Sequence, residues 1–361
     1  MGQSPDGSTY SDFPSDYILV QGNADLDKGW VKPRIWTSQI TKTANAGDLI
    51  MSVRAPAGSM GKTGYDVVIG RGVAAIKGNE FIFQLLIKMD LDDFWKGFSC
   101  GSTFESLNSD NIANASIFIP RQDEQKVIGQ YFSLLDNLIT LHQREYDKTL
   151  NIKKAMLEKM FPKNGEDRPE IRFAGFTDAW EQRKLGDIAD FNPKVELPEV
   201  FEYVDLESVV GTEMIFHREE TKITAPSRAQ RLAQVGDLFY QTVRPYQRNN
   251  YLFEKTDNTY VFSTGYAQMR PNIDGYFLLS FVQTDLLVKA VLDRCTGTSY
   301  PAINANDLAE MEVRIPPLRH EQEQIGAYFR NIDNLITLHQ RELKKLQNMK
   351  KALLEKMFVQ G

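Results

Sequence analysis

The chain has 361 residues, of which 42% are hydrophobic and 25% charged, a composition typical of globular proteins. This length predicts two domains, or three, each large enough for its own core. A net charge of −6 excludes a uniformly basic nucleic-acid-binding protein, although a local basic surface is still compatible with phosphate contact. No apolar run approaches a membrane span. Two cysteines and no signal peptide predict reduced thiols in a cytoplasmic protein.

Short apolar runs separated by Gly, Pro, Asp and Asn fill residues 1–120. The runs at 17–20, 49–53 and 73–76 are bounded by turn residues, a pattern typical of short β-strands. A denser apolar segment at about 80–89 predicts one helix within this region. We therefore expect a β-rich first domain.

Residues 121–162 predict a first long helix. Ile128, Phe132 and Leu135 recur at steps of three and four, and Pro162 ends the pattern. Nearly forty residues at about 1.5 Å each would form a helix of roughly 60 Å, which is too long to lie on one small domain. Such a helix needs a partner helix.

The chain then repeats this organisation. After a polar linker over 163–170, a second β-rich region covers 171–316 and a second long helix covers 317–361. The stretch 124–161 returns 197 positions later as 321–358, with about two positions in three identical and no gap. Such self-similarity indicates an internal tandem repeat. We expect an α+β protein whose two β-rich domains are joined by two long helices forming an antiparallel coiled coil.

Several patterns resemble catalytic or nucleotide-binding motifs but lack required positions. The Gly-Lys-Thr run at 61–63 would end a phosphate-binding loop, yet Pro56 stands where that motif requires glycine. No glycine-rich dinucleotide fingerprint follows a predicted strand. His142 and His339 occupy one repeat position beside Leu and Ile rather than beside converging ligands. We expect no catalytic residue and no metal site in this chain.

The segment 242–250 has the composition of a loop that recognises DNA bases. Arginine pairs with guanine, and asparagine or glutamine with adenine, through two hydrogen bonds each. A polar surface hairpin is the alternative, and the sequence is equally compatible with both. The candidate DNA contacts here are Arg244, Tyr246, Gln247, Arg248, Asn249 and Asn250.

Other candidate DNA contacts are spread over both β-rich regions. Small polar loops suit phosphate contact, and arginine or lysine adds the necessary charge. The second domain contributes Thr298, Ser299 and Tyr300, with Arg228 and Arg231 as further candidates, and the first domain contributes Arg54, Ser59, Lys62 and Arg71.

Polar residues that recur in both long helices are candidates for binding a partner protein. Two helices packed on each other leave outer faces on which partner helices can lie. Helix capping and hydrogen bonds within the chain are the competing explanation. The candidates are Glu124, Gln125 and Asp136 in the first helix and Glu321, Gln322 and Asp333 in the second.

Four features together carry a family resemblance over essentially the whole chain. They are the run at 297–358, its twin at 101–161, the Trp-Glu-Gln-Arg-Lys-Leu-Gly stretch at 180–186, and Met-Gly-Gln-Ser-Pro at residues 1–5. With them the chain resembles the specificity subunit of type I restriction-modification systems. The chain departs from the family pattern at one point. Residues 180–191 precede the second domain, but the first domain has no counterpart of them.

The resemblance implies a non-catalytic, sequence-specific DNA-binding subunit. Each domain would recognise one half of a bipartite double-stranded DNA target, while the helices would set the gap and dock two methyltransferase subunits. Restriction subunits would join this core. S-adenosylmethionine, ATP and Mg would be bound by the partners, and no cofactor by this chain. The alternatives are a coiled-coil protein-binding scaffold without DNA specificity, a silent recombination cassette of such a subunit, and an enzyme with an unrecognised nuclease site.

Overall fold

The computed structural model describes residues 1–98, 106–297 and 299–358, which form two compact units. Unit 1 combines Met1–Gln143 with Arg341–Gly361, and unit 2 is Arg144–Gln340. Each unit therefore takes one β-rich region and part of each long helix.

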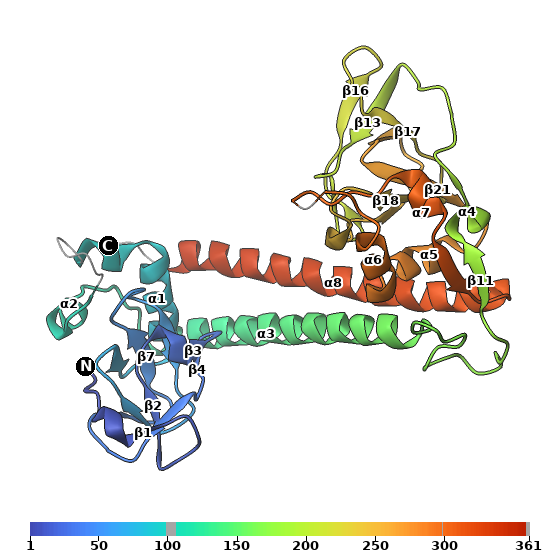
Figure 1. The fold of residues 1–361 in the computed structure, drawn as a ribbon. Helices are drawn as coiled ribbons and strands as arrows, with labels where there is room; N and C mark the ends of the chain where they lie inside the picture. Colours follow the sequence, from blue (N-terminus) through green and yellow to red (C-terminus); the bar gives the residue numbers. More distant parts are fainter. Residues whose placement is uncertain (99–105, 298, 359–361) are drawn as a thin grey trace. The chain divides into compact units, whose positions relative to one another are not determined.

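The two predicted long helices are present as α3 (Gln122–Lys159) and α8 (Arg319–Met357). Unit 1 holds the first half of α3 and the last part of α8, whereas unit 2 holds the other halves. Figure 1 shows the helices and strands of each unit in sequence colours.

Two five-stranded sheets form the β-rich part of unit 1. Their strand orders are β1-β5-β2-β9-β6 and β10-β7-β8-β4-β3, and only the β2–β9 and β4–β8 pairs are parallel. Val20, Ile50 and Val73 are buried where the sheets face each other. Successive side chains of a strand point to opposite faces. Leu49 and Met51 therefore point to the other face of β7, where they pack against α1.

The elements of unit 1, apart from the long helices, are β1 (Tyr10–Ser11), β2 (Tyr17–Val20), β3 (Leu26–Asp27), β4 (Trp30–Val31), β5 (Ile35–Thr37), β6 (Thr43–Ala44), β7 (Leu49–Ser52), β8 (Met60–Lys62), β9 (Val67–Ile69), β10 (Val73–Ile76), α1 (Glu80–Leu91) and α2 (Ser109–Ala113), with 3-10 turns at Gly7–Thr9, Asn23–Asp25 and Phe94–Phe98.

Unit 2 has the same plan with four-stranded sheets. Their orders are β12-β21-β18-β19 and β16-β13-β20-β17, with β13–β20 the parallel pair. Phe239 and Phe262 stack between the sheets, with ring centroids 3.6 Å apart. Leu238 and Tyr240 point to the opposite face, toward α5 and α6.

The elements of unit 2, apart from the long helices, are β11 (Glu181–Lys184), α4 (Leu185–Ile188), β12 (Ala189–Phe191), β13 (Val200–Val204), β14 (Val209–Val210), β15 (Glu213–Met214), β16 (Arg218–Thr221), β17 (Ala229–Leu232), β18 (Leu238–Gln241), η4 (Pro245–Gln247), β19 (Tyr251–Leu252), β20 (Tyr260–Ser263), β21 (Tyr266–Pro271), α5 (Gly275–Val282), α6 (Asp285–Leu292), α7 (Ala305–Ala309) and β22 (Glu312–Ile315).

The apolar stretch that begins at Tyr276 forms two helices, α5 and α6. Gln283 and Thr284 separate α5 from α6, and the Thr284 side chain accepts a hydrogen bond from Leu287 N, which caps a new helix. Among the residues with described positions, no single helix is long and apolar enough to cross a membrane. The α5–α6 pair passes that test by length and composition alone, with a 63° bend between its members.

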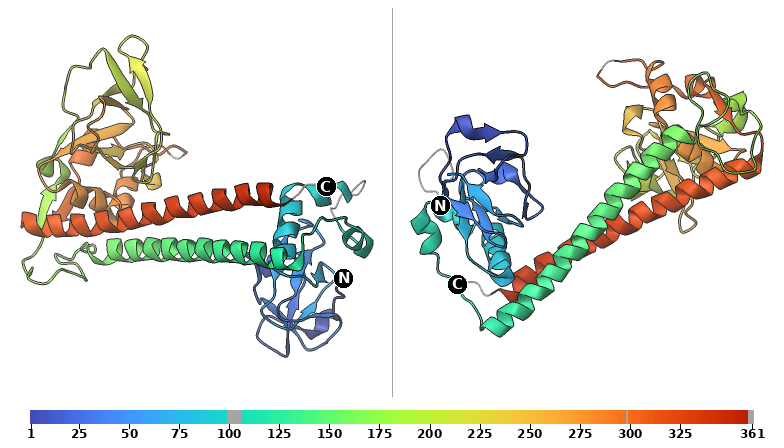
Figure 2. Two further views of the ribbon diagram at one scale, coloured as in Figure 1. Left: turned by 180° about the vertical axis from the view of Figure 1, so that it is seen from behind. Right: turned by 90° about the horizontal axis from the view of Figure 1, so that it is seen from below.

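Within unit 1 the two long helices run antiparallel. The Lys350 ammonium lies 2.5 Å from the Asp136 carboxylate, and the Phe358 ring lies 5.7 Å from that of Phe132. Moving back along α3 therefore means moving forward along α8. Figure 2 shows these helix ends from two further sides.

Unit 2 contains the same contacts between the other two helix halves. The Lys153 ammonium lies 2.6 Å from the Asp333 carboxylate, and the Phe161 ring stacks 5.9 Å from Phe329. Each of these residues is 197 positions from its counterpart in unit 1. The duplication in sequence is thus also a duplication of contacts.

A glutamine fastens the start of each long helix to its domain. Gln125 donates to Pro120 O at 2.9 Å and accepts from the N-cap residue of α1. Gln322 donates to Pro316 O at 2.9 Å and accepts from the N-cap residue of α5. Both side chains are buried, so the prediction that they dock a partner protein is wrong.

Glu321 is also unavailable to a partner, because its side chain is fully buried. Arg172 donates to both carboxylate oxygens, at 2.7 and 2.8 Å, and Trp180 Nε1 donates to one of them at 3.3 Å. Two hydrogen bonds from one guanidinium are the geometry in which a buried carboxylate is best compensated. The carboxylate holds the segment before β11 against α8.

We predict that Arg172→Met destabilises unit 2 by about 3–5 kcal/mol, because it leaves the Glu321 carboxylate buried without a counter-charge. Urea unfolding followed by tryptophan fluorescence measures the loss. Arg319→Met is the matched control, since Arg319 pairs with Glu323 on the exposed face of the same helix and should cost about 0–1 kcal/mol. Equal losses in the two variants would contradict this account.

Candidate nucleic-acid interface

Two left-handed residues shape the 242–250 loop of unit 2. Arg244 and Arg248 have φ angles of 55° and 56° and flank the short turn η4. Non-glycine residues hold this conformation only where the surroundings fix it. Arg244 N donates to Pro301 O at 2.8 Å, and Thr242 N donates to Gly265 O at 3.0 Å, so the loop is attached to its neighbours on both sides.

Two of the predicted DNA contacts hold this loop in place instead. Asn250 is 1% exposed, and its Oδ1 accepts from Gln241 N at 2.9 Å. Arg248 donates to Gln283 O at 2.9 Å and forms an ion pair with Asp285 at the start of α6. The prediction that Asn250 contacts a base is therefore wrong, because its side chain is buried in the fold. The Arg248 side chain is paired but 34% exposed.

Three other residues of the loop line one pocket of about 500 Å³: Arg244, Gln247 and Asn249. The Arg244 guanidinium lies over the Tyr300 ring, 4.7 Å from its centroid, within the range of a cation–π interaction. Its donors form no hydrogen bond or ion pair with any residue of described position. The guanidinium N–H groups therefore remain available to bind a ligand.

The two amides beside Arg244 are held through their oxygens. Gln247 Oε1 accepts from Gln241 Nε2 at 2.8 Å, and Asn249 Oδ1 accepts from Gly211 N at 2.9 Å. Each amide is therefore oriented with its NH₂ group still available, as recognition of base edges requires.

The pocket also contains acidic residues that the sequence reasoning missed. Asp205 and Glu207 follow strand β13, and Arg228 precedes β17. Burial opposes ionisation of Asp205, but hydrogen bonds from Ser208 and Arg218 outweigh it and leave its pKa below the ordinary value. The signal in the sequence was an Asp directly after a strand, with a Ser three residues later, since this pattern forms a turn.

The remaining candidates of unit 2 are dispersed. Tyr246 and Tyr300 are 49% and 64% exposed, and Ser299 is exposed beside Tyr300. Thr298 lies outside the described residues. Arg231 is half-buried, and its buried Nε has no hydrogen-bond partner among the described residues.

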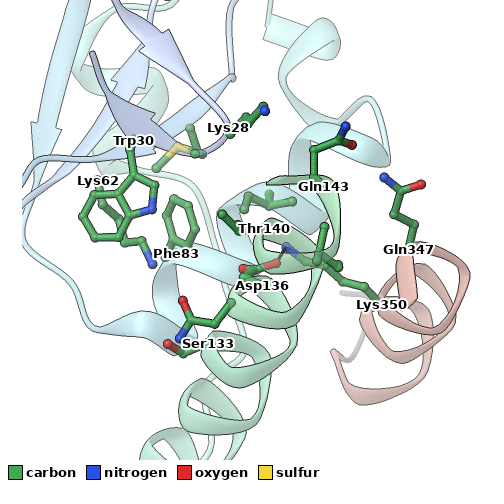
Figure 3. A pocket seen from close by; sticks show the side chains of 15 residues that line it. Lys28, Trp30, Lys62, Phe83, Ser133, Asp136, Thr140, Gln143, Gln347 and Lys350 are labelled. Atoms are coloured by element: carbon green, nitrogen blue, oxygen red, sulfur yellow. Dashed lines mark hydrogen bonds and ion pairs between the residues drawn. The ribbon is translucent and has the colours of Figure 1, made fainter. Parts of the chain in front are cut away.

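In unit 1 Lys62 is not available for phosphate contact. Its ammonium lies 4.8 Å from the Trp30 ring centroid, 4.6 Å from that of Phe83, and 2.8 Å from the Glu80 carboxylate. Figure 3 shows it between the two rings, at the edge of a pocket of about 490 Å³ that the domain forms with the helices of this unit. The prediction of a DNA-binding Lys62 is therefore wrong.

Arg54 and Arg71 remain as exposed cations of unit 1. Val53 N donates to Gly72 O at 2.9 Å, which brings the backbones beside the two arginines together. Ser59 is half-buried, and its carbonyl accepts from Ser52 N. Of the four candidates in the first domain, Arg54 and Arg71 are therefore the two exposed cations.

Comparison with known proteins gives this architecture a family. The model of the type I restriction modification DNA specificity domain matches residues 21–151 and again 207–348. The chain belongs to this family.

Among curated relatives, the MjaVIII specificity subunit of a type I restriction enzyme of Methanocaldococcus jannaschii is 22% identical over 286 residues, covering 73% of this chain and 66% of its own length. A shorter match, 29% identical over 165 residues, covers 44% of this chain and 38% of the sequence designated the MjaX specificity subunit of that organism. The chain thus spans less than two thirds of the length of these relatives.

The solved structures include a similar fold. The crystal structure of a type I restriction-modification system S subunit from M. genitalium aligns with a TM-score of 0.68 at 14% identity, over 100% of this chain and 93% of that one. This likeness concerns the fold.

Two aspartates of this specificity-domain protein that were predicted to dock a partner are used inside the units. Asp136 pairs with Lys350, and Asp333 pairs with Lys153 and accepts from Tyr276 OH at 2.9 Å. Burial and the neighbouring Asp333 carboxylate raise the pKa of Tyr276. Both aspartates are only half-buried.

An exposed apolar stripe lies on the first half of α3 in unit 1. Its members recur at alternating steps of four and three, the spacing of a helix that packs on another helix. They are Val127, Tyr131, Leu134, Leu138 and Leu141, which are 66%, 42%, 60%, 38% and 53% exposed.

The equivalent face of α8 is less apolar. Leu335 and Leu338 match Leu138 and Leu141, but Gln324 and Asn331 replace the valine and the central leucine. The nearly identical helices therefore differ on their outer faces.

Proposed function

We propose that the chain is the sequence-specific DNA-binding subunit of a type I restriction-modification complex. The β-rich regions 1–120 and 171–316 would be target-recognition domains, each reading one half of a bipartite sequence. The observation that carries the proposal is Arg244, which is stacked on Tyr300 with its donors unused and lies beside the oriented amides of Gln247 and Asn249. This is the donor arrangement that recognises guanine and adenine edges.

The helices would serve as the spacer and as the surface for partner proteins. Antiparallel contacts between α3 and α8 inside both units support a continuous coiled coil built from the tandem repeat. The apolar stripe on α3 supports docking of a partner helix, for which two methyltransferase subunits are the candidates. Glu124 is exposed and remains a candidate at the edge of that surface.

Catalysis would belong to the partners. Methyltransferase and restriction subunits would bind S-adenosylmethionine, ATP and Mg and act in the cytoplasm on the DNA that this chain selects. Phosphate contacts by exposed arginines such as Arg54, Arg71 and Arg228 would add a salt-dependent, sequence-independent part to affinity.

We expect Arg244→Ala to relax or abolish one half of the recognised motif, since a bidentate arginine–base pair contributes about 1–3 kcal/mol of discrimination. The chain is co-expressed with methyltransferase subunits and methylated adenines are mapped across the host genome. The wild type should methylate a split motif with a fixed gap. Arg183→Ala is the control, because Arg183 is an exposed residue outside the pocket.

Methylation by the Arg244→Ala complex at the unchanged motif would contradict the assignment of this pocket. Partner binding without any sequence-selective DNA binding by the wild-type complex would instead favour the protein scaffold.

A second prediction concerns the gap. Inserting seven residues after Gln143 and seven after Gln340 lengthens both helices by about 10 Å and keeps their faces aligned within about 20°. At 3.4 Å per base pair, the gap in the methylated motif should lengthen by about three base pairs, or recognition should fail. Full methylation with the original gap would show that the helices do not set it.

A third prediction concerns docking. Leu134→Asp places a charge in the middle of the exposed stripe and should weaken methyltransferase binding at least ten-fold in a pull-down or titration. The change should leave folding intact, because the side chain is 60% exposed. Asn331→Asp at the equivalent position of α8 is the matched control and should have little effect. Undiminished binding by Leu134→Asp would remove the stripe from the interface.

A further inference from the structure

We propose that the pocket between the first domain and the helices of unit 1 binds a small molecule that combines a planar aromatic ring with an anionic group. The pocket has a volume of about 490 Å³, within the range of roughly 300–1,000 Å³ that is typical of small-ligand sites. The proposal does not depend on DNA recognition. It follows from the side chains that differ between the two units at equivalent positions.

Unit 2 fills the equivalent place with its own side chains. Glu213 begins the second strand of the β14–β15 hairpin, and its carboxylate accepts a hydrogen bond from the Thr337 hydroxyl of α8. Arg330 of the same helix lies over the Tyr276 ring, 4.8 Å from its centroid, and pairs with Glu254. Two carboxylates of the domain therefore bind the helix within this unit.

Unit 1 carries different residues at these positions. Ser133 and Thr140 of α3 stand 197 positions before Arg330 and Thr337 of α8. The β3–β4 hairpin takes the place of β14–β15, since the two hairpins follow β2 and β13, which form equivalent parallel pairs with β9 and β20. Trp30 begins β4 as the glutamate begins β15. Unit 1 thus has a serine in place of the arginine and a tryptophan in place of the glutamate.

The substitutions leave polar groups of the pocket without partners. Ser133, Asn137, Thr140 and Gln347 line the pocket, and their side chains form no hydrogen bond with any described residue. The threonine is the informative one, because its counterpart Thr337 donates to a carboxylate in unit 2. A ligand with an anionic acceptor would restore that hydrogen bond in unit 1.

The charges around the pocket also favour an anion. Those of its lining are Lys28, Lys62 and Lys350 with one carboxylate, Asp136. Lys62 pairs with Glu80, and Lys350 pairs with Asp136. Lys28 forms no ion pair with any described residue. One ammonium group therefore remains uncompensated, and its attraction for an anion is stronger in a recess than in open water.

An aromatic wall forms the other part of the pocket. The Trp30 side chain is 50% exposed, although the Lys62 ammonium lies 4.8 Å from its ring centroid. Phe83 and Met60 continue this wall, and Figure 3 shows the two rings beside Thr140 of α3. Aromatic rings pack on one another in offset or edge-to-face arrangements. A planar ring next to an anionic group would therefore cover the indole and reach the free donors.

The test uses the full chain and two fluorescent probes with the same rings. Anilinonaphthalene sulfonate is an aromatic anion, and phenylnaphthylamine lacks the charge. The sulfonate should bind saturably at one site per chain. Phenylnaphthylamine should bind at least ten-fold more weakly, although it is the more apolar compound, because the pocket selects the anionic group.

Indole signals in nitrogen-15 NMR spectra locate the bound sulfonate. The chain has four tryptophans, and the variant Trp30→Phe identifies the signal of Trp30 by its loss. Saturation with the sulfonate should shift the Trp30 signal. The signal of Trp180, which is buried in unit 2, should stay unchanged.

Variants of the chain test the two parts of the pocket. Trp30→Ala and Lys28→Glu should each weaken the sulfonate at least ten-fold. Thr140→Val removes only the hydroxyl and should weaken the sulfonate about three-fold or more while leaving phenylnaphthylamine unaffected. Phe13→Ala and Lys42→Glu are the matched controls, since both residues are exposed in the same domain outside the pocket, and should change affinity by less than about two-fold. Circular dichroism checks that each variant is folded.

Absence of saturable sulfonate binding would overturn the proposal, as would equal or tighter binding of phenylnaphthylamine. An unchanged Trp30 signal at saturation would also overturn it. Full affinity in both Trp30→Ala and Lys28→Glu would show that the probe binds an exposed apolar surface elsewhere, which contradicts the proposal as well.

Discussion

Neither domain core is complete without the end of the helix that belongs to the other repeat. Phe358 closes the second repeat but packs in unit 1 against Phe81 and Phe132. Phe161 closes the first repeat but packs in unit 2 against Phe277 and Phe329. Because burying an aromatic ring contributes roughly 1.5–3 kcal/mol, this exchange couples the stability of each domain to both helices.

The exchange also explains which polar residues recur in the two repeats. A long amphipathic helix is stabilised by burial of its apolar face rather than by propensity, and its position against a domain has to be fixed. Gln125 and Gln322 fix it by binding the chain that enters the long helix and the N-cap residue of an earlier helix, α1 or α5. The paired charges, Asp136 with Lys350 and Asp333 with Lys153, fix one helix against the other. Recurrence in the sequence indicated a shared role, and that role is internal.

The sequence predicted the elements better than the site. Periodicity and proline boundaries predicted α3, α8 and α1 closely, because an apolar face at helical spacing has few alternative uses. The composition of the 242–250 loop made Arg244 and Arg248 equal candidates for base contact. Whether a given arginine is directed outward, like Arg244, or toward α6, like Arg248, depends on residues up to 56 positions away in the chain. Local composition does not contain that information.

A rigid loop in fact requires that some of its polar side chains be used internally. The left-handed conformations at Arg244 and Arg248 cost free energy. The hydrogen bond that Asn250 accepts from Gln241 N and the one that Arg248 donates to Gln283 O offset this cost. The remaining side chains are then oriented before a ligand arrives, and less conformational entropy is lost on binding. The same division separates the repeats, since the Glu321 carboxylate is paired within unit 2 while its counterpart Glu124 is exposed in unit 1. A position that is buried in one unit and exposed in the other therefore indicates a binding surface more reliably than the polarity of its side chain does.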